Sequence, residues 1–138
     1  MSQENVEIAR EVFLANGSGD PVAAHAARER FFDPSIEWDM SGVAGWTEKS
    51  LYRGQEVEEF LQAWADSWQE WHFDLEEIRG AGEEQVFAAI HEWGIGIGSG
   101  ASVDQRRYFA VTLRDGKAVT VEMFSDRQEA LEAAGLSE

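Results

Sequence analysis

The sequence predicts an α+β fold in which a strongly bent antiparallel or mixed sheet wraps around three helices, with a short helix at the C-terminal end. Apolar residues at helical spacing dominate the first half of the chain, and alternating runs dominate the second. Hairpin signals such as "RDGK" separate those runs. Helices followed by strands indicate a sheet packed against segregated helices. Without linker, repeat or low-complexity tract, residues 1–138 are expected to form one domain.

Three helices are predicted in the first half, over residues 3–16, 21 to about 32, and 54–68. Asp20 and Pro21 form a good N-cap and first turn for the second helix, and the "DP" at 33–34 ends it. The third has the clearest pattern, because its bulky apolar residues fall on one stripe. "SIEWD" then alternates as a short strand between the second and third helices, and a loop is expected over 40–53.

The second half is expected to supply four strands and a final helix. The strands are predicted near residues 71–79, 85–97, 102–114 and 117–125, with turns at "GAGEE" and "RDGK". Asp126 is positioned to cap the last helix, "RQEALEAA", which Gly135 stops.

The stretch "HEWGIGIGSGA", residues 91–101, has glycine at every second position from Gly94 to Gly100. It matches a weak dinucleotide fingerprint, but the following residues have the pattern of a strand, whereas that fingerprint must open a helix. Nucleotide binding is therefore excluded. Two interpretations stay open: a flexible hairpin end, or a bare sheet face that leaves space for a ligand.

The composition narrows the class of partner. With 11 basic and 27 acidic residues, the net charge of −16 disfavours nucleic acid and membrane surfaces. The absence of cysteine excludes disulfides and thiolate chemistry. The polar, acidic segment "MSQENVEIAR" is unlike a signal peptide, and no apolar run approaches the roughly 20 residues of a membrane span. A soluble, cytoplasmic protein is expected.

Motifs along nearly the whole chain resemble the SnoaL-like polyketide cyclase family of the nuclear transport factor 2-like (NTF2-like) superfamily, which also contains the ketosteroid isomerases. They are "SQENVEIAREVF", "DPSIEW", "YRGQEVEEFLQAW", "GSGASVDQR", "TLRDGKAV" and "SDRQEALEAAG". The resemblance implies a cone-shaped fold, an apolar pocket enclosed by sheet and helices, and a homodimer paired through the sheet.

The isomerase chemistry itself does not transfer. The resemblance places Trp38 where those enzymes carry a catalytic aspartate, with Asp39 one step on and facing the other way in a regular strand. Val12 or Phe13, and Phe109, stand where they carry the tyrosine and protonated aspartate of the oxyanion hole. The isomerase triad is absent.

Glu92 is the first candidate catalytic residue. It shares strand parity with the bare glycines and with Val86 and Ala88, so it projects into the pocket if that face is concave. Burial there would favour the neutral acid and suit general acid–base work. A register shifted by one residue would instead make Glu92 a solvated residue and His91 the pocket base. Asp39 is a further candidate, at the pocket mouth.

Pocket walls are expected from aromatic and other large side chains, although core packing explains the same residues. Arg107 shares parity with Phe109 and could pair with Glu92 or bind an anionic group. The candidate ligand-binding residues are Trp38, Trp46, Tyr52, Phe60, Trp64, Arg107, Phe109 and Met123. The three histidines show no metal-ligand spacing, so neither a metal nor a cofactor is expected.

Three functions are compatible with these features. The first is an enzyme that acts on a small apolar, cyclic molecule by proton transfer, in a cyclisation, isomerisation or dehydration. The second is a non-catalytic pocket that binds a hydrophobic molecule. The third is a dimeric interaction module with a packed interior and no ligand.

Overall fold

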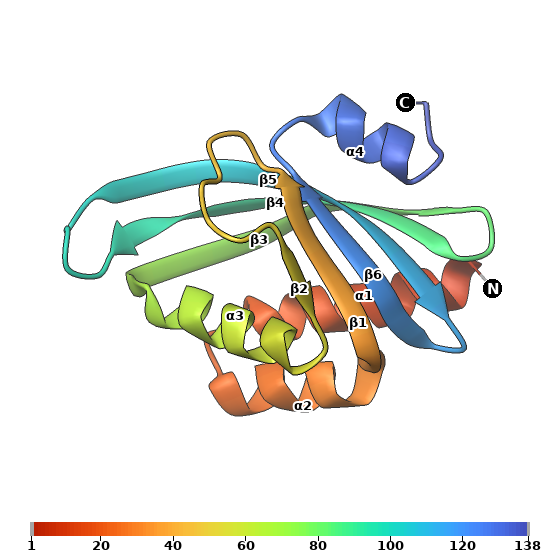
Figure 1. The fold of residues 1–138 in the computed structure, drawn as a ribbon, viewed down its shortest axis with the longest axis horizontal. Coiled ribbons are helices and arrows are strands. Elements are labelled where there is room, and N and C mark those ends of the chain that lie inside the picture. The colour runs from red at the N-terminus through yellow and green to blue at the C-terminus, as the bar shows by residue number, and fades with distance from the viewer. Residues whose placement is uncertain (1, 138) are drawn as a thin grey trace.

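The computed structural model describes residues 2–137, which form four helices and one six-stranded sheet (Figure 1). The helices are α1 (Ser2–Asn16), α2 (Pro21–Phe31), α3 (Gln55–Asp66) and α4 (Arg127–Ala133). The strands are β1 (Phe32–Gly42), β2 (Leu51–Arg53), β3 (Trp68–Ala81), β4 (Gln85–Gly96), β5 (Ser102–Arg114) and β6 (Lys117–Phe124). The predicted α+β class is confirmed.

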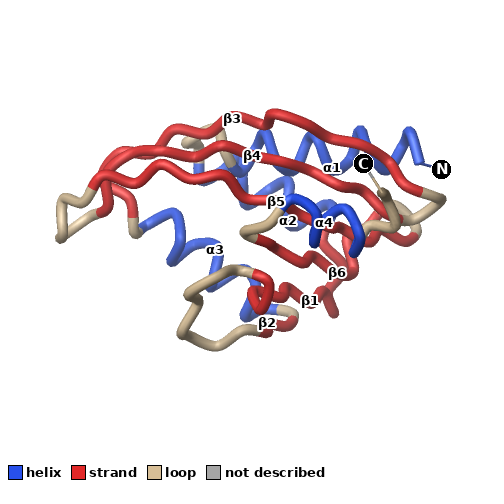
Figure 2. The backbone as a smooth tube through the Cα atoms, turned by 90° about the horizontal axis from the view of Figure 1, so that it is seen from above, coloured by secondary structure: helices blue, strands red, loops and turns tan. Residues whose placement is uncertain are grey.

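The sheet is mixed and open. Its strand order is β2-β1-β6-β5-β4-β3, with β1 and β6 parallel and the other neighbours antiparallel. In Figure 1, α1, α2 and α3 lie on one face, called here the inner face, and α4 lies on the other, the outer face. The sheet curves from β3 round to β1 and β2 in Figure 2. None of the four described helices has the length and hydropathy that a membrane span requires.

Strand alternation gives the sheet a core on each face. Val86 and Ala88 of β4 belong to the inner core, with residues of α1 and α3. Phe87 of the same strand belongs to the outer core, where Ala130 and Leu131 of α4 cover it. Because successive strand side chains point to opposite faces, this register also fixes the direction of every later residue of β4.

The first strand differs from the prediction at both ends. The "DP" at 33–34 was expected to separate helix from strand, but β1 already begins at Phe32. The register between β1 and β6 shifts between Phe32 and Glu37, so the missing N–H of Pro34 falls in an irregular stretch of the ladder. Part of the expected loop over 40–53 also pairs, since β1 continues to Gly42 and β2 occupies 51–53.

The alternating glycines have separate roles. A Cβ added at Gly94, whose φ is +154°, would lie 1.9 Å from the carbonyl oxygen of Glu70 on β3. Gly94 therefore permits the close approach of β3 and β4, beside the register shift between Trp68 and Glu70. Gly96 is less confined, because its nearest neighbour would be the Ser99 hydroxyl at 3.5 Å.

Candidate functional site

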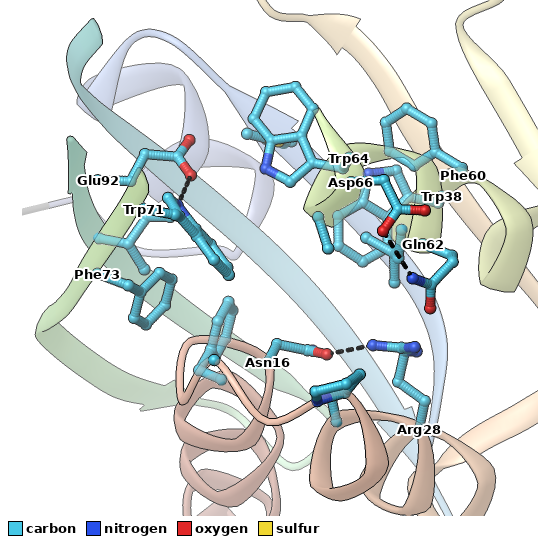
Figure 3. Close-up of a pocket in the computed structure, with 18 of the residues that line it drawn as sticks. Asn16, Arg28, Trp38, Phe60, Gln62, Trp64, Asp66, Trp71, Phe73 and Glu92 are labelled. Carbon is cyan, nitrogen blue, oxygen red and sulfur yellow. Dashed lines mark hydrogen bonds between the residues drawn. The ribbon is translucent and has the colours of Figure 1, made fainter. Parts of the chain in front are cut away.

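A cavity of about 310 Å³ lies between the inner face of the sheet and helices α1, α2 and α3 (Figure 3). Its walls are largely apolar and aromatic: Phe13, Trp38, Met40, Phe60, Leu61, Trp64, Trp71, Phe73, Ile90, Phe109 and Met123. Asn16, Asp20, Arg28, Gln62, Asp66 and Glu92 add polar groups. A mostly apolar cavity with a few polar side chains is typical of small-molecule sites.

The aromatic walls support one another. Trp38 packs edge-on against Phe109, with ring centroids 6.1 Å apart, and lies 6.3 Å from Phe60 on α3. Near the start of β3, Trp71 packs against Phe73 at 5.8 Å. Rings held in such contacts keep the shape of the cavity, because each aromatic neighbour limits the others' movement.

Glu92 of β4 is the buried carboxyl group of the cavity, with only 1% of its surface exposed. Its Oε1 accepts a hydrogen bond from the Trp71 indole Nε1 at 3.0 Å, drawn in Figure 3, and its Oε2 accepts one from Gln105 Nε2 at 2.8 Å. Two donors from neighbouring strands thus fix the carboxyl group against the apolar wall. A buried acid needs such partners to be tolerated.

Arg107 of β5 fixes the orientation of Gln105. Its terminal amino group donates to Gln105 Oε1 at 2.8 Å. Because an arginine only donates, the Gln105 oxygen faces Arg107 and the amide nitrogen is left to bond Glu92. Burial lowers the pKa of the Arg107 guanidinium, while the negative charge of Glu92 acts in the opposite direction.

The second polar group of the cavity lies on the helices. Arg28 of α2 is 6% exposed, and its Nε donates to both carboxylate oxygens of Glu58 on α3, at 3.1 and 3.0 Å. Another guanidinium nitrogen donates to Asn16 Oδ1 at the end of α1. Burial alone would raise the pKa of Glu58, but the hydrogen bond and charge of Arg28, with a smaller effect of His25, hold that pKa below its ordinary value.

Comparison with solved structures shows what this architecture resembles. A Jannaschia sp. CCS1 protein described as a SnoaL-like polyketide cyclase aligns with a TM-score of 0.76 and 16% identity, over 96% of this chain and 92% of that one. An NTF2-like protein from Burkholderia xenovorans aligns at 0.67 and 25% identity, over 97% of each chain. The chain has the NTF2-like fold. The resemblance noted in the sequence is confirmed for the fold.

A third neighbour with the NTF2-like fold is an epoxide hydrolase/cyclase-like enzyme with a role in pyran ring formation in the polyether salinomycin. It aligns with a TM-score of 0.69 and 19% identity, over 90% of this chain and 92% of that one. Comparison of the sequence with protein-family models and with curated proteins gives no match.

Five predicted ligand-binding residues line the cavity of this NTF2-like fold: Trp38, Phe60, Trp64, Phe109 and Met123. Trp46 and Tyr52 do not line it. They pack against Phe60, with ring centroids 5.9 and 4.3 Å away, and Trp46 donates its indole N–H to the Lys49 carbonyl at 2.9 Å. Arg107 does not line it either; it hydrogen-bonds Gln105, which in turn bonds Glu92.

The three candidate catalytic residues separate onto two faces. Glu92 faces the cavity, as its parity with Val86 and Ala88 predicted. His91 lies on the outer face, where it hydrogen-bonds Asp104 at 2.8 Å and stacks on Trp93 at 4.5 Å. Asp39 is also on the outer face and accepts from the Ser41 amide at 2.8 Å. Neither lines the cavity.

Sequence reasoning missed several polar or amphipathic residues of the site, among them Asn16, Arg28, Trp71 and Gln105. Polar residues on amphipathic helices usually face solvent, so Asn16 and Arg28 carried no signal of their own. The parity of β5 could have found Gln105, because it shares a face with Arg107 and Phe109. Within residues 2–137, no cluster of three or more His, Cys, Asp or Glu side chains could hold a metal ion.

Proposed function

We propose that the protein binds a small apolar, cyclic molecule in this cavity and that Glu92 transfers a proton to or from it. One observation carries the proposal: a carboxyl group that is 1% exposed lines an apolar cavity, and Trp71 and Gln105 fix its orientation. A titratable group held within reach of a bound molecule is the requirement for general acid–base catalysis.

The supported reactions are cyclisation, isomerisation or dehydration, because each requires a proton to leave one atom of a ring system and another to be delivered. The role of one structural neighbour in pyran ring formation supports ring chemistry. A non-catalytic binding protein would use the same cavity, and the difference between the two functions lies in Glu92.

The test begins with a ligand. Thermal denaturation is measured against a library of cyclic aromatic, terpenoid and polyketide-like compounds, where a compound at about 100 times its Kd adds about 2.7 kcal/mol of stability. Each hit is then incubated with the protein in D₂O, and deuterium incorporation is followed by NMR. This readout detects proton transfer without knowledge of the product.

The decisive variant is Glu92→Gln, with Glu122→Gln as the matched control. Glu122 lies on the outer face of β6 and away from the cavity. We expect Glu92→Gln to bind the hit with little change and to lose exchange by about 100-fold or more, and Glu122→Gln to keep it. Exchange at the wild-type rate in Glu92→Gln would reject the catalytic role and leave a binding protein.

A homodimer paired through the sheet and a cytoplasmic location remain predictions. The outer face carries a stack in which Trp93 lies 4.5 Å from His91 and 5.4 Å from His72, and this is the surface that such pairing would cover. Sedimentation equilibrium of the wild type and of Trp93→Glu tests it: a dimer that dissociates in the variant supports the interface.

A further inference from the structure

We propose that Asn16 and Arg28 form a hydrogen-bond-donor subsite for a neutral acceptor oxygen of the ligand, such as that of a cyclic ketone. The inference rests on the proposed binding function and narrows the class of ligand. Figure 3 shows Asn16 and Arg28 on a different side of the cavity from Glu92. A ligand would therefore meet an acceptor carboxyl group at one end and donors at the other.

The orientation of the Asn16 amide follows from its partner. A guanidinium nitrogen of Arg28 donates to Asn16 Oδ1, and an arginine cannot accept a hydrogen bond. The atom facing Arg28 must therefore be the amide oxygen, which leaves Nδ2 on the other branch of the side chain. Asn16 lines the cavity, and among the described residues no group accepts a hydrogen bond from its Nδ2. Its N–H groups are available to a ligand.

Arg28 adds further donors. Its Nε and one terminal nitrogen are directed at Glu58, and the other terminal nitrogen at Asn16. A guanidinium carries more N–H groups than these bonds use. Because Arg28 is only 6% exposed and lines the cavity, a ligand oxygen that enters the cavity is an available acceptor for these hydrogens.

The charges of the subsite favour a neutral oxygen. The Arg28 cation is paired with Glu58, whose lowered pKa keeps it ionised at neutral pH, so the pair has little net charge. Asp20 and Asp66 add acidic side chains to the cavity lining. A ligand carboxylate would meet this acidic surrounding without a free cation to offset the loss of its hydration, whereas a ketone oxygen loses much less hydration on binding.

The experiment compares three compounds with one ring skeleton: tetralin, 1-tetralone and tetralin-1-carboxylate. Binding is followed by the fluorescence of the cavity tryptophans, Trp38, Trp64 and Trp71. Asn16→Asp keeps the oxygen that Arg28 bonds and replaces the Nδ2 donor with an acceptor. We expect it to weaken 1-tetralone binding by about tenfold and to leave tetralin within about twofold. The wild type should bind the carboxylate more weakly than the ketone.

Gln128→Glu, the same amide-to-acid change on the exposed side of α4, controls for the added charge and should leave all three Kd values unchanged. A second measurement does not depend on a variant that folds. In the wild type, the infrared C=O stretch of bound 1-tetralone should lie below its frequency in hexane, because hydrogen bonds weaken the carbonyl bond.

Two outcomes overturn the inference while the proposed function stands: a C=O frequency equal to that in hexane, or an equal loss of tetralin and 1-tetralone binding in Asn16→Asp. If the wild type binds neither tetralin nor 1-tetralone, the apolar-ligand function fails for this class of compound, and the subsite fails with it. The tetralin measurement thus separates the two failures.

Discussion

The surroundings of Glu122 on β6 disfavour the ionised form of its carboxyl group. Burial on the outer face of the sheet, and secondarily the negative charge of Asp39 on β1, raise the pKa of its carboxyl group. In the folded protein Glu122 therefore binds its proton more tightly than in the unfolded chain. The stability that this supplies is fully present below the unfolded pKa, and it is lost as the pH rises through the raised folded pKa.

We predict that Glu122→Gln stabilises the protein at neutral pH, because glutamine keeps the shape without the charge. The gain in melting temperature should be up to about 2 °C, the shift for about 0.5 kcal/mol in a domain of this size. Thermal denaturation of both proteins at about pH 4.5 and pH 7.5 checks the sign. A gain that is larger at the lower pH contradicts the assignment of this carboxyl group.

The close approach of strands β3 and β4 depends on Gly94. We predict that Gly94→Ala lowers the free energy of unfolding by about 1–3 kcal/mol, because its Cβ would lie 1.9 Å from the Glu70 carbonyl oxygen and force β3 and β4 apart. Gly96→Ala, one pleat further along the same strand, should change it by less than about 0.5 kcal/mol. Urea unfolding measures both. Equal losses would show that this approach is not the constraint.

Most elements could be predicted from local pattern, because amphipathic spacing, the Asp20 and Asp126 caps and the turn at "RDGK" are signals within a few residues. Strand β2 has no such local signal, because three residues are too few to show alternation. The parallel pairing of β1 with β6 could not be predicted either. The paired residues lie more than 80 positions apart, and the sequence of β1 does not indicate whether its neighbour runs parallel or antiparallel.

In the candidate site too, residues placed by local pattern could be predicted, and residues placed by contacts between distant elements could not. Parity along β4 placed Glu92 on the cavity face, and parity along β5 placed Phe109 there. Arg28 could not be found, because its burial depends on Glu58, 30 positions later on another helix. Trp46 and Tyr52 were misplaced for a related reason: Phe60 lies between them and the cavity, and this packing order is a property of the assembled fold.

The cavity is a largely apolar space between the sheet and the helices that no side chain of the protein fills. Protein interiors are otherwise close-packed, and side chains that line such a space make fewer contacts with one another than side chains of a packed core. A chain of 138 residues has a limited core from which to offset that loss. We therefore expect the cavity to lower the free energy of unfolding while it provides room for a ligand, as is common at functional sites.

Ala24 and Ala27 of α2 test whether the cavity lowers stability and serves binding. Both side chains are buried, and of the two only Ala24 is among the described residues that line the cavity. We predict that the Ala24→Leu side chain extends into the cavity, raises the free energy of unfolding by about 1 kcal/mol, and weakens 1-tetralone binding more than tenfold. Ala27→Leu meets packed atoms and should instead lower the free energy of unfolding by about 1–3 kcal/mol. Urea unfolding and tryptophan fluorescence measure the two effects. If Ala24→Leu destabilises the protein as much as Ala27→Leu does, the space beside α2 is too small to receive a side chain, and the ligand must lie nearer to Glu92.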